Sequence, residues 1–490
     1  MLGWTVLGAV LPGTGLIAAG RRRVGGVVLV LFLALFGVLG WMALTERQGL
    51  ARFSVDTSNL VWVIVAISAI ALLWIAVIVV GYRLLLPRRT PRGKQLLGGL
   101  VVTLLVLGVA LPAYFVGRLA GTTREFIADV FDDDVASATV EDVPDPFGDK
   151  ERINVLLLGG DAGHNREGTR TDTVIVASID TETGDTTLIS LPRNLQNLPF
   201  PEDSPLAEVY PAPQGFTGAT ESDGLLNAIY DNGPSAHPDI LGPTDNPGAD
   251  FLKLGVGEAL GLPIDYYVLV NLQGFRELVN ALGGITVNVN YWVPIGGSDS
   301  EGILPDAYIA PGPNQRLTGY YALMYARGRY GLTDYDRMAR QRCAIKAIID
   351  AADPITLLRR YERLAETTKD IVLTDIPGRA LDDFVDLAFL VKDAEIRSLV
   401  FDPAVIEPAY PDYDKMRRLV DRALNPPPPS NGDGSSSSSA SSSAPPSDPA
   451  ATPTPEPGED PVDDVKDACA YDPEQAAEAR AEGEPPSRFG

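Results

Sequence analysis

The chain has 490 residues, a formal net charge of −24 at pH 7 and a sequence pI of about 4.5. A chain this acidic repels the phosphate backbone of nucleic acids, so we expect no nucleic acid partner. With two histidines and no GxxxxGK(S/T) segment, the sequence also offers little for a zinc–histidine site, a Ser/His/Asp triad or a nucleotide-hydrolysing phosphate loop.

The N-terminal region contains apolar stretches that are each long enough to cross a membrane as a helix. They are Val24–Leu44, Val61–Val80 and Leu96–Val116. A further apolar stretch, Leu2–Ala19, is interrupted by proline and glycine, which leaves a fourth span, a re-entrant hairpin and an interfacial helix as alternatives. We expect residues 1–118 to form a membrane region of three or four helices.

Basic residues beside these stretches set the expected orientation. One group, at residues 21–23, precedes the first clear span, and another lies between the second and third: Arg83, Arg88, Arg89, Arg92 and Lys94. Both groups belong on the cytoplasmic side by the positive-inside rule. We therefore expect a multi-pass protein of the cell membrane whose remaining chain is extracytoplasmic.

Residues 119–151 are polar and acidic, which predicts a stalk. The runs INVLLLGGD, TVIVASID and TTLISLPR then predict three strands, with a tight hairpin turn at TETGD. Residues 199–249 are expected to be a long loop containing one short helix. Beyond it, strand and helix patterns alternate, which favours an α/β sandwich with a mixed central sheet.

The domain is expected over residues 152–424, with its core at 152–350. Residues 425–490 are rich in Pro, Ser and acidic residues, and we expect a disordered tail there. The two cysteines, Cys343 and Cys469, form either a disulfide or two separate thiols. We favour the disulfide, because an exposed unpaired thiol is a liability in an oxidising compartment.

Five arginines crowd into YARGRYGLTDYDRMARQR, residues 325–342. Arginine suits phosphate oxyanions, because its planar fork donates paired hydrogen bonds and its charge is permanent. Arg327 and Arg329 share a face if this piece is extended. On the next helix, one side carries a second group, namely Arg337, Arg340 and Gln341. Arg342 points elsewhere and is expected to be a surface or ion-pair residue.

Further charged residues lie where predicted strands meet loops. Arg170 precedes the second strand, and Arg193 follows the third. Asp161 ends the first strand and Asp172 begins the second, so neighbouring strands would bring the two carboxylates together. With phosphate oxygens and water they form a candidate Mg²⁺ site. The alternative is a plain turn at Asp161, with Arg and Asp neutralising each other.

Six blocks in chain order resemble the LytR-CpsA-Psr (LCP) family of bacterial envelope proteins, from about residue 152 to 350. They are LLLGGD, RTDTVIVASID, SLPRN, LNAIYDNG, LGLPIDYYVLVNLQGFRELVNALGGITVNV, and LTGYYALMYARGRYG with DYDRMARQR. The multi-span N-terminus and the Ser/Pro tail are similar to actinobacterial members. The resemblance implies an α/β/α sandwich with an apolar groove. It further implies Mg²⁺-dependent transfer of a glycopolymer from undecaprenyl or decaprenyl pyrophosphate to peptidoglycan.

Matching the family's motifs implies roles for single residues. Asp161 and Asp172 match its metal-binding aspartates. The groups that match its pyrophosphate contacts are Arg170, Arg193, Arg327, Arg329, Arg337, Arg340 and Gln341. We expect three of these to take part in catalysis: Arg193, Arg340 and Gln341. The chain departs from the pattern at Asn194, where Asp is frequent, and at Leu225, where Lys is frequent. These departures leave the identity of the catalytic base open, and Asp334 and Asp336 are alternatives.

For the lipid groove, the apolar candidates are Phe251, Leu252 and Val256 on one helix, with Leu278 and Leu282 on another. Residues at such helical spacing are ordinarily core. Two other functions remain open. A polyprenyl pyrophosphatase would use the same arginines with water as the acceptor. A non-catalytic membrane protein would bind wall glycan or the lipid carrier and regulate envelope assembly.

Overall fold

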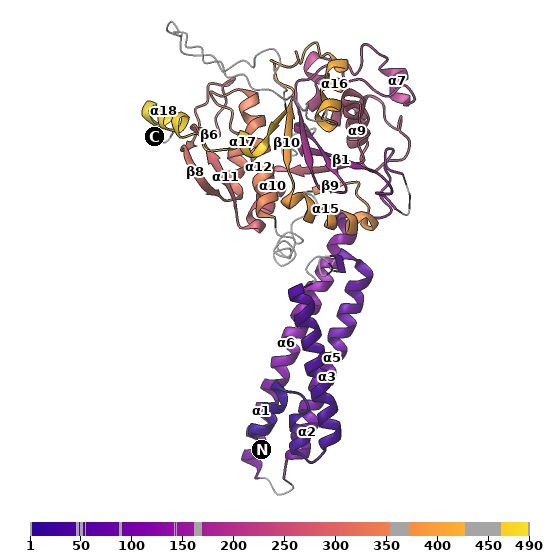
Figure 1. Cartoon of the computed structure of the whole chain (residues 1–490), viewed down its shortest axis with the longest axis vertical. Helices are drawn as coiled ribbons and strands as arrows, with labels where there is room; N and C mark the ends of the chain where they lie inside the picture. The colour runs from indigo at the N-terminus through magenta and orange to yellow at the C-terminus, as the bar shows by residue number, and fades with distance from the viewer. Residues whose placement is uncertain are drawn as a thin grey trace, which may run out of the picture. The chain divides into compact units, whose positions relative to one another are not determined.

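The computed structural model describes residues 2–45, 49, 52–53, 55–87, 91–141, 143, 145–160, 169–352, 372–426 and 462–488. The chain forms two compact units (Figure 1). One contains the N-terminal helices through Asp133 together with residues 378–386, and the other contains most of the chain from Asp134 on. The candidate site lies wholly within this second, larger unit.

The first unit is helical. Its helices are α1 (Leu2–Val10), α2 (Thr14–Ala18), α3 (Arg22–Thr45), α5 (Thr57–Leu85) and α6 (Arg92–Val130). Three described helices are long and apolar enough to cross a membrane, namely Arg22–Met42, Thr57–Leu85 and Arg92–Val130, as predicted. Residues 2–19 form two short helices rather than one continuous helix. The break includes Gly13, whose φ of 104° suits glycine.

The predicted stalk, residues 119–151, is not a separate segment. Helix α6 continues through its first part to Val130. Beyond Asp134 the segment packs on the larger unit, where Ser137 and Thr139 donate hydrogen bonds to the buried Asp250 carboxylate at 2.8 and 2.6 Å. Polar composition indicated exposure, but these hydroxyl groups satisfy a buried acid instead.

The larger unit is built on a seven-stranded sheet with the order β11-β10-β3-β2-β1-β4-β9. Its strands are β1 (Arg152–Gly160), β2 (Thr171–Asp180), β3 (Thr186–Leu191), β4 (Tyr266–Asn271), β9 (Val372–Thr374), β10 (Ile396–Val400) and β11 (Val462–Asp464). Strands β1 to β3 are antiparallel neighbours, whereas β4 is parallel to β1 and β10 to β3. The predicted mixed sheet and the β2–β3 hairpin are confirmed.

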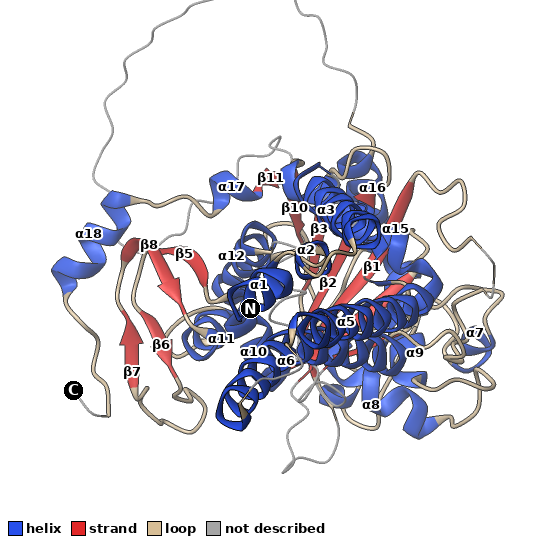
Figure 2. Ribbon diagram, turned by 90° about the horizontal axis from the view of Figure 1, so that it is seen from below, coloured by secondary structure: helices blue, strands red, loops and turns tan. Residues whose placement is uncertain are grey.

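Helices cover both faces of this sheet (Figure 2). The side that we call the α9 face carries α8 (Leu226–Ala236), α9 (Pro247–Leu260) and α16 (Tyr413–Leu424). The side that we call the α12 face carries α10 (Leu272–Leu282), α11 (Gly319–Arg327), α12 (Asp334–Ala351) and α17 (Val465–Ala468). Alternate residues of β2 serve the two layers: Val174 and Val176 pack on the α9 face, and Ile175 on the α12 face. This is the predicted α/β/α sandwich.

Smaller elements complete the larger unit. Strand β5 (Ile285–Val289) pairs with β8 (Gly312–Leu317), and β6 (Val293–Ile295) pairs with β7 (Ala307–Ile309). Further short elements of the larger unit are α7 (Pro205–Val209), η1 (Glu221–Asp223) and α18 (Pro473–Glu482). Helix α15 (Leu381–Asp393) is shared, because its first part, like η3 (Gly378–Ala380), belongs to the first unit. The loop predicted at 199–249 thus contains α7, η1 and α8.

The prediction of a disordered tail over 425–490 is wrong for residues 462–488. Residues 427–461 lie outside the described part of the chain, but β11 pairs with β10, and α17 packs on α12. Cys343 on α12 and Cys469 after α17 form a disulfide, the pairing favoured from sequence. The buried Val465, this covalent bond and the backbone pairing order a segment that its acidic composition marked as loose.

Candidate functional site

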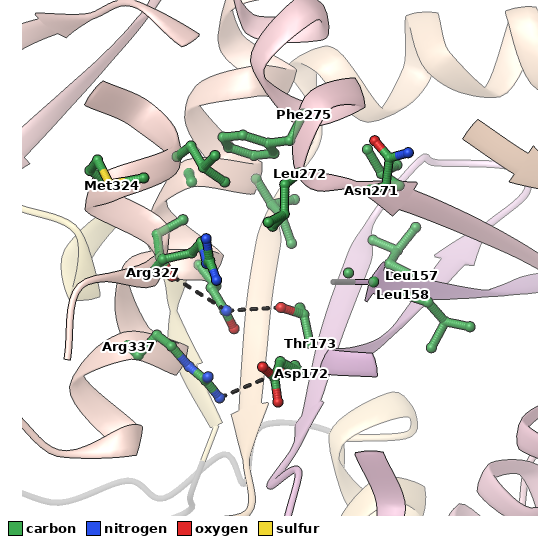
Figure 3. A pocket seen from close by; sticks show the side chains of 18 of the residues that line it. Leu157, Leu158, Asp172, Thr173, Asn271, Leu272, Phe275, Met324, Arg327 and Arg337 are labelled. Atoms are coloured by element: carbon green, nitrogen blue, oxygen red, sulfur yellow. Dashed lines mark hydrogen bonds between the residues drawn. The ribbon is translucent and has the colours of Figure 1, made fainter. Parts of the chain in front are cut away.

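A cavity of about 490 Å³ lies between the central sheet and the helices of the α12 face. Strands β1, β2 and β4 line one side of it, and α10, α11 and α12 line the other. Most of the wall is apolar and includes Leu157, Val268, Val270, Leu272, Leu278 and Ile349. Figure 3 shows Asp172 and Arg337 toward one end, and Phe275 and Met324 toward the other. The cavity therefore joins an apolar compartment to a charged one.

The end of strand β1 keeps the floor of this cavity open. Gly159 and Gly160 are its last residues and line the cavity. A Cβ atom on Gly159 would lie 2.8 Å from Thr173 Oγ1 on the paired strand, which is closer than real side chains tolerate. Only glycine therefore lets β1 pair here while Thr173 keeps its position at the cavity wall.

Asp172 holds its carboxylate in a fixed position at the charged end. Its Oδ1 accepts hydrogen bonds from Arg193 Nη1 at 2.9 Å and from Asn227 Nδ2 at 3.1 Å. Burial favours a higher pKa for Asp172. The hydrogen bonds and charge of Arg193, with smaller contributions from Asn227 and Arg337, outweigh it and hold the pKa below its usual value. Asp172 is therefore an ionised carboxylate that needs cationic neighbours.

Asp334, which sequence offered as a base, is surrounded by guanidinium groups. Its Oδ2 lies 2.9 Å from Arg337 Nη2, and its Oδ1 lies 3.2 Å from Arg193 Nε and 3.8 Å from Arg329 Nη1. Arg193 thus links Asp334 to Asp172. Because these arginines outnumber the two carboxylates, the cluster keeps a net positive charge and suits an anionic ligand.

Arg337 is the buried member of this cluster, with 3% exposure. Besides Asp334, it donates to the Asp172 carbonyl oxygen at 3.1 Å. Burial lowers the pKa of Arg337 to about 10, so the group remains charged at neutral pH. Its Nε is also buried and has no hydrogen-bond partner among the described residues.

Three other predicted residues also line the cavity: Arg327, Arg329 and Gln341. Gln341 Nε2 donates to Thr173 Oγ1 at 2.8 Å and, more weakly, to the Ala326 carbonyl at 3.4 Å. It thereby connects α12 to β2 and to the end of α11. The structure brings these three residues together with Asp172, Arg193 and Arg337.

Arg340 and Arg170 are not among the cavity-lining residues, and Arg193 joins the group only through its ion pairs with Asp172 and Asp334. Arg340 is buried and donates to Tyr325 O at 2.7 Å, to Tyr291 Oη at 2.8 Å and to Gly328 O. Arg170 is exposed just before β2. The predicted grouping of Arg340 with Arg337 on one helix side therefore does not carry its guanidinium into the cavity.

The predicted metal site is described only in part, because Asp161 lies outside the described residues. Among the residues that the structure describes, no group of three His, Cys, Asp or Glu side chains is placed to hold a metal ion. Asp172 nevertheless fits a hard cation, since both of its side-chain hydrogen bonds reach Oδ1 and leave Oδ2 available.

Several sequence-based expectations are corrected here. Phe251, Leu252 and Val256 pack in the solid core of the α9 face, and Leu282 belongs to another core cluster, so only Leu278 of the groove candidates lines the cavity. Arg342 is not a surface residue: it is 8% exposed and donates to Ser398 Oγ at 2.7 Å. Helical spacing identified the apolar side of each helix correctly, but it did not predict whether that side packs in a solid core or lines the cavity.

Nothing in the sequence alone assigned a role to Asn227 or Thr173. Asn227 donates its side chain to Asp172 and its backbone N–H to the Arg193 carbonyl at 3.0 Å, so it holds both ends of that ion pair. Thr173 receives Gln341. Both residues lie inside blocks that carry the family resemblance, LNAIYDNG and RTDTVIVASID, and this position was the only sequence feature that pointed to a role in the site. Asp336 caps α12 through Thr333, which removes it from the candidate bases.

Comparison with known proteins gives related sequences across this region. Over 250 residues the chain is 31% identical to the Enterococcus faecalis protein named polyisoprenyl-teichoic acid–peptidoglycan teichoic acid transferase TagU, covering 50% of this chain and 67% of that protein. It is 26% identical to Bacillus subtilis TagU over 278 residues, covering 56% and 76%. Biofilm regulatory protein A of Streptococcus mutans is 27% identical over 292 residues, covering 58% and 63%.

Solved structures also align with part of the chain. Protein gbs0355 from Streptococcus agalactiae aligns with 26% identity and a TM-score of 0.39, covering 51% of this chain and 77% of that one. For Bacillus subtilis TagV the identity is 25% and the TM-score 0.38, with 57% and 99% covered. The model of the LytR_cpsA_psr family matches residues 123–403, which is more than half of the chain. The chain therefore belongs to the LytR_cpsA_psr family.

Proposed function

We propose that this protein transfers a glycopolymer from a polyprenyl diphosphate carrier to peptidoglycan. The observation that carries the proposal is the cavity itself, in which an apolar wall ends in clustered arginines. A prenyl chain fits the first part chemically and a diphosphate fits the second. The names of the TagU relatives, which specify a polyisoprenyl-linked teichoic acid and peptidoglycan, support the same donor and acceptor classes.

In the proposed reaction, a peptidoglycan hydroxyl oxygen attacks the phosphorus attached to the glycopolymer. A new P–O bond forms, and the bond from that phosphorus to the bridging oxygen of the diphosphate breaks. The polyprenyl phosphate leaves with the bridging oxygen and its electron pair, and the hydroxyl proton ends on this released phosphate. Arg337 and Arg193 stabilise the charge that develops on the phosphate oxygens.

Asp334 does not serve as the general base in this scheme. Three guanidinium groups lie within 4 Å of its carboxylate, so both of its oxygens are engaged in ion pairs. Its role is to hold Arg193, Arg329 and Arg337 in one cluster before the donor binds. Phosphoryl transfer depends mainly on such positioning, so a strong base is not required.

We assign Mg²⁺ as the cofactor, with Asp172 and Asp161 as its protein ligands. When bound, the ion would neutralise charge on the diphosphate oxygens. Asp172 would present Oδ2, while Arg193 and Asn227 keep hold of Oδ1. We further propose that the basic residues around the N-terminal helices place the larger unit outside the cell membrane, where peptidoglycan is available.

The test uses the purified full chain in detergent with a prenyl diphosphate-linked oligosaccharide as donor and peptidoglycan fragments as acceptor. Arg337→Ala should lower transfer by about 100- to 1,000-fold. Arg337→Lys should restore little of it, since an ammonium group lacks the planar fork that donates to Asp334 and to a phosphate from separate nitrogens. The matched control is Arg418→Ala, an exposed arginine on α16 at the other face of the sheet, which should transfer normally.

Wild-type transfer by Arg337→Ala would overturn the proposed role of the cluster. Release of polyprenyl phosphate at the same rate with and without acceptor would instead assign hydrolysis with water as the acceptor. Binding of the donor without any turnover would assign a non-catalytic protein that recognises the lipid carrier.

A further inference from the structure

Arg340 is a buried cation that the proposed chemistry does not use. It lies on α12, three residues after Arg337 and next to Gln341, yet it does not line the cavity. The residue is 3% exposed, and each of its three guanidinium nitrogens donates a hydrogen bond. Burying a charge is costly, and these three hydrogen bonds offset part of that cost.

Two of its three acceptors belong to the carboxyl end of α11. Nε donates to Tyr325 O at 2.7 Å, and Nη2 donates to Gly328 O. The last carbonyl groups of a helix lack partners within the helix, and the negative end of the helix dipole favours a cation there. Arg340 therefore acts as a side-chain cap that α12 supplies to α11.

The capped turn carries the two arginines that reach the cavity from α11. Gly328 lies between Arg327 and Arg329, and its φ of −52° and ψ of 126° take the chain out of the helix. A Cβ atom on Gly328 would lie 2.5 Å from the Pro294 carbonyl oxygen, so the turn sits directly against β6. Small movements of this turn would redirect both arginine side chains.

Tyr291, just before β6, supplies the third acceptor. Its hydroxyl accepts from Arg340 Nη1 at 2.8 Å, and its ring centroid lies 5.7 Å from the guanidinium carbon. Burial raises the pKa of Tyr291, so the hydroxyl stays neutral. Arg340 thus joins three pieces of chain, namely α12, the end of α11 and the approach to β6.

We propose that Arg340 is a positioning residue that aims Arg327 and Arg329 at the diphosphate without touching it. This inference rests on the proposed function for the identity of the ligand. It separates two arginines of α12 that the sequence pattern grouped together: Arg337 contacts the ligand, and Arg340 builds the turn that presents two further contacts.

The test measures binding of farnesyl diphosphate, a short prenyl diphosphate, to the full chain in detergent by titration calorimetry. Arg340→Lys keeps the charge but has one nitrogen in place of three, so it cannot reach Tyr325 O, Gly328 O and Tyr291 Oη in the same geometry. The affinity should therefore fall by about tenfold or more. Tyr291→Phe removes one acceptor and should cause a smaller loss in the same direction. Arg342→Lys, a buried arginine on the same helix that donates to Ser398, is the matched control and should bind normally.

A double-mutant comparison distinguishes positioning from direct contact or general destabilisation. In a chain with both Arg327→Ala and Arg329→Ala, the added Arg340→Lys substitution should change affinity by less than about twofold. An undiminished loss in that background, or wild-type affinity of Arg340→Lys alone, would overturn the inference. Because binding is the readout, a wild-type chain that binds farnesyl diphosphate but transfers nothing would refute the proposed function and leave this test intact.

Discussion

The two faces of the central sheet use the same strands but cover them differently. On the α9 face, Leu252 and Val256 are fully buried in a continuous core. On the α12 face, Phe275 and Leu278 are only partly buried and border a cavity that ends in charged groups. The strands offer apolar side chains to both sides, so the covering helices decide which face is solidly packed and which contains a cavity.

A disulfide bond and side-chain hydrogen bonds hold the helical layer of the α12 face, where the cavity reduces apolar packing. Helix α12 is joined through the Cys343–Cys469 disulfide to the segment that contains β11, and this segment continues across β5 and β6. Asn288 Nδ2 donates to Cys469 O at 3.0 Å, and Trp292 Nε1 donates to Ala479 O at 2.8 Å. A covalent bond and polar contacts thus hold a layer that lacks full apolar packing.

The largest expected effect follows from this covalent tie. Cys343→Ala together with Cys469→Ala should lower the free energy of unfolding by about 4 to 5 kcal/mol, because the bond closes a long loop in the unfolded chain. The cysteines are 126 residues apart. Pulse proteolysis of the full chain in detergent across a urea series measures the change. A loss below about 1 kcal/mol would show that the polar contacts suffice without the bond.

A carboxylate on each side of the sheet forms an ion pair with a buried cation. Near the α9 face, Asp375 and Lys253 form a 2.6 Å ion pair whose side chains are each 1% exposed. Asp375→Asn leaves that lysine charge buried and should cost about 3 to 5 kcal/mol. Asp334 is 26% exposed at the cavity, and its buried partner Arg337 keeps the Asp172 carbonyl as an acceptor, so Asp334→Asn should cost less, about 1 to 2 kcal/mol. The same urea series decides, and equal losses would refute the comparison.

A matched pair of truncations tests the packing difference directly. Leu252→Ala should cost about 3 to 4 kcal/mol, because it opens a void in a filled core. Leu278→Ala should cost only about 1 kcal/mol, since that side chain already borders the cavity. Urea midpoints of the two variants provide the measurement. If Leu278→Ala proved as costly as Leu252→Ala, the cavity would be closed in solution.

Sequence patterns predicted the sheet, the hairpin and the long apolar helices, because each of these depends on the local pattern of apolar residues. They did not predict which face is hollow, since Leu252 and Leu278 both stand at ordinary helical spacing. They grouped Arg337 with Arg340, although residues three apart on a helix point in directions that differ by about 60° around its axis. That difference is enough to send one guanidinium to the cavity and the other to the end of α11.

The C-terminal segment illustrates a second limit. Strand β11 has only three residues, two of them aspartates, and it joins the sheet by backbone pairing with β10. Side-chain composition carries no signal for such a pairing, because the hydrogen bonds are made by the main chain. Likewise, Asn227 became visible as a site residue only when the fold placed α8 beside Asp172.

The smallest expected effect comes from filling the cavity. Leu278→Trp adds bulk where space exists, so it should change the free energy of unfolding by less than about 1 kcal/mol. Leu252→Trp, its match in the filled core of the α9 face, should cost about 1 to 3 kcal/mol through overpacking. The two substitutions make the same chemical change, so the difference between them reports the space available on each face.

Filling the cavity should also separate its two compartments functionally. Leu278→Trp should weaken binding of farnesyl diphosphate by about tenfold while leaving binding of inorganic pyrophosphate unchanged, because the tryptophan excludes the prenyl chain but does not reach the arginine cluster. Titration of the full chain with both ligands measures this. Equal weakening of the two ligands would mean that the apolar part of the cavity is not where the prenyl chain lies, and the α12 face would then be hollow for another reason.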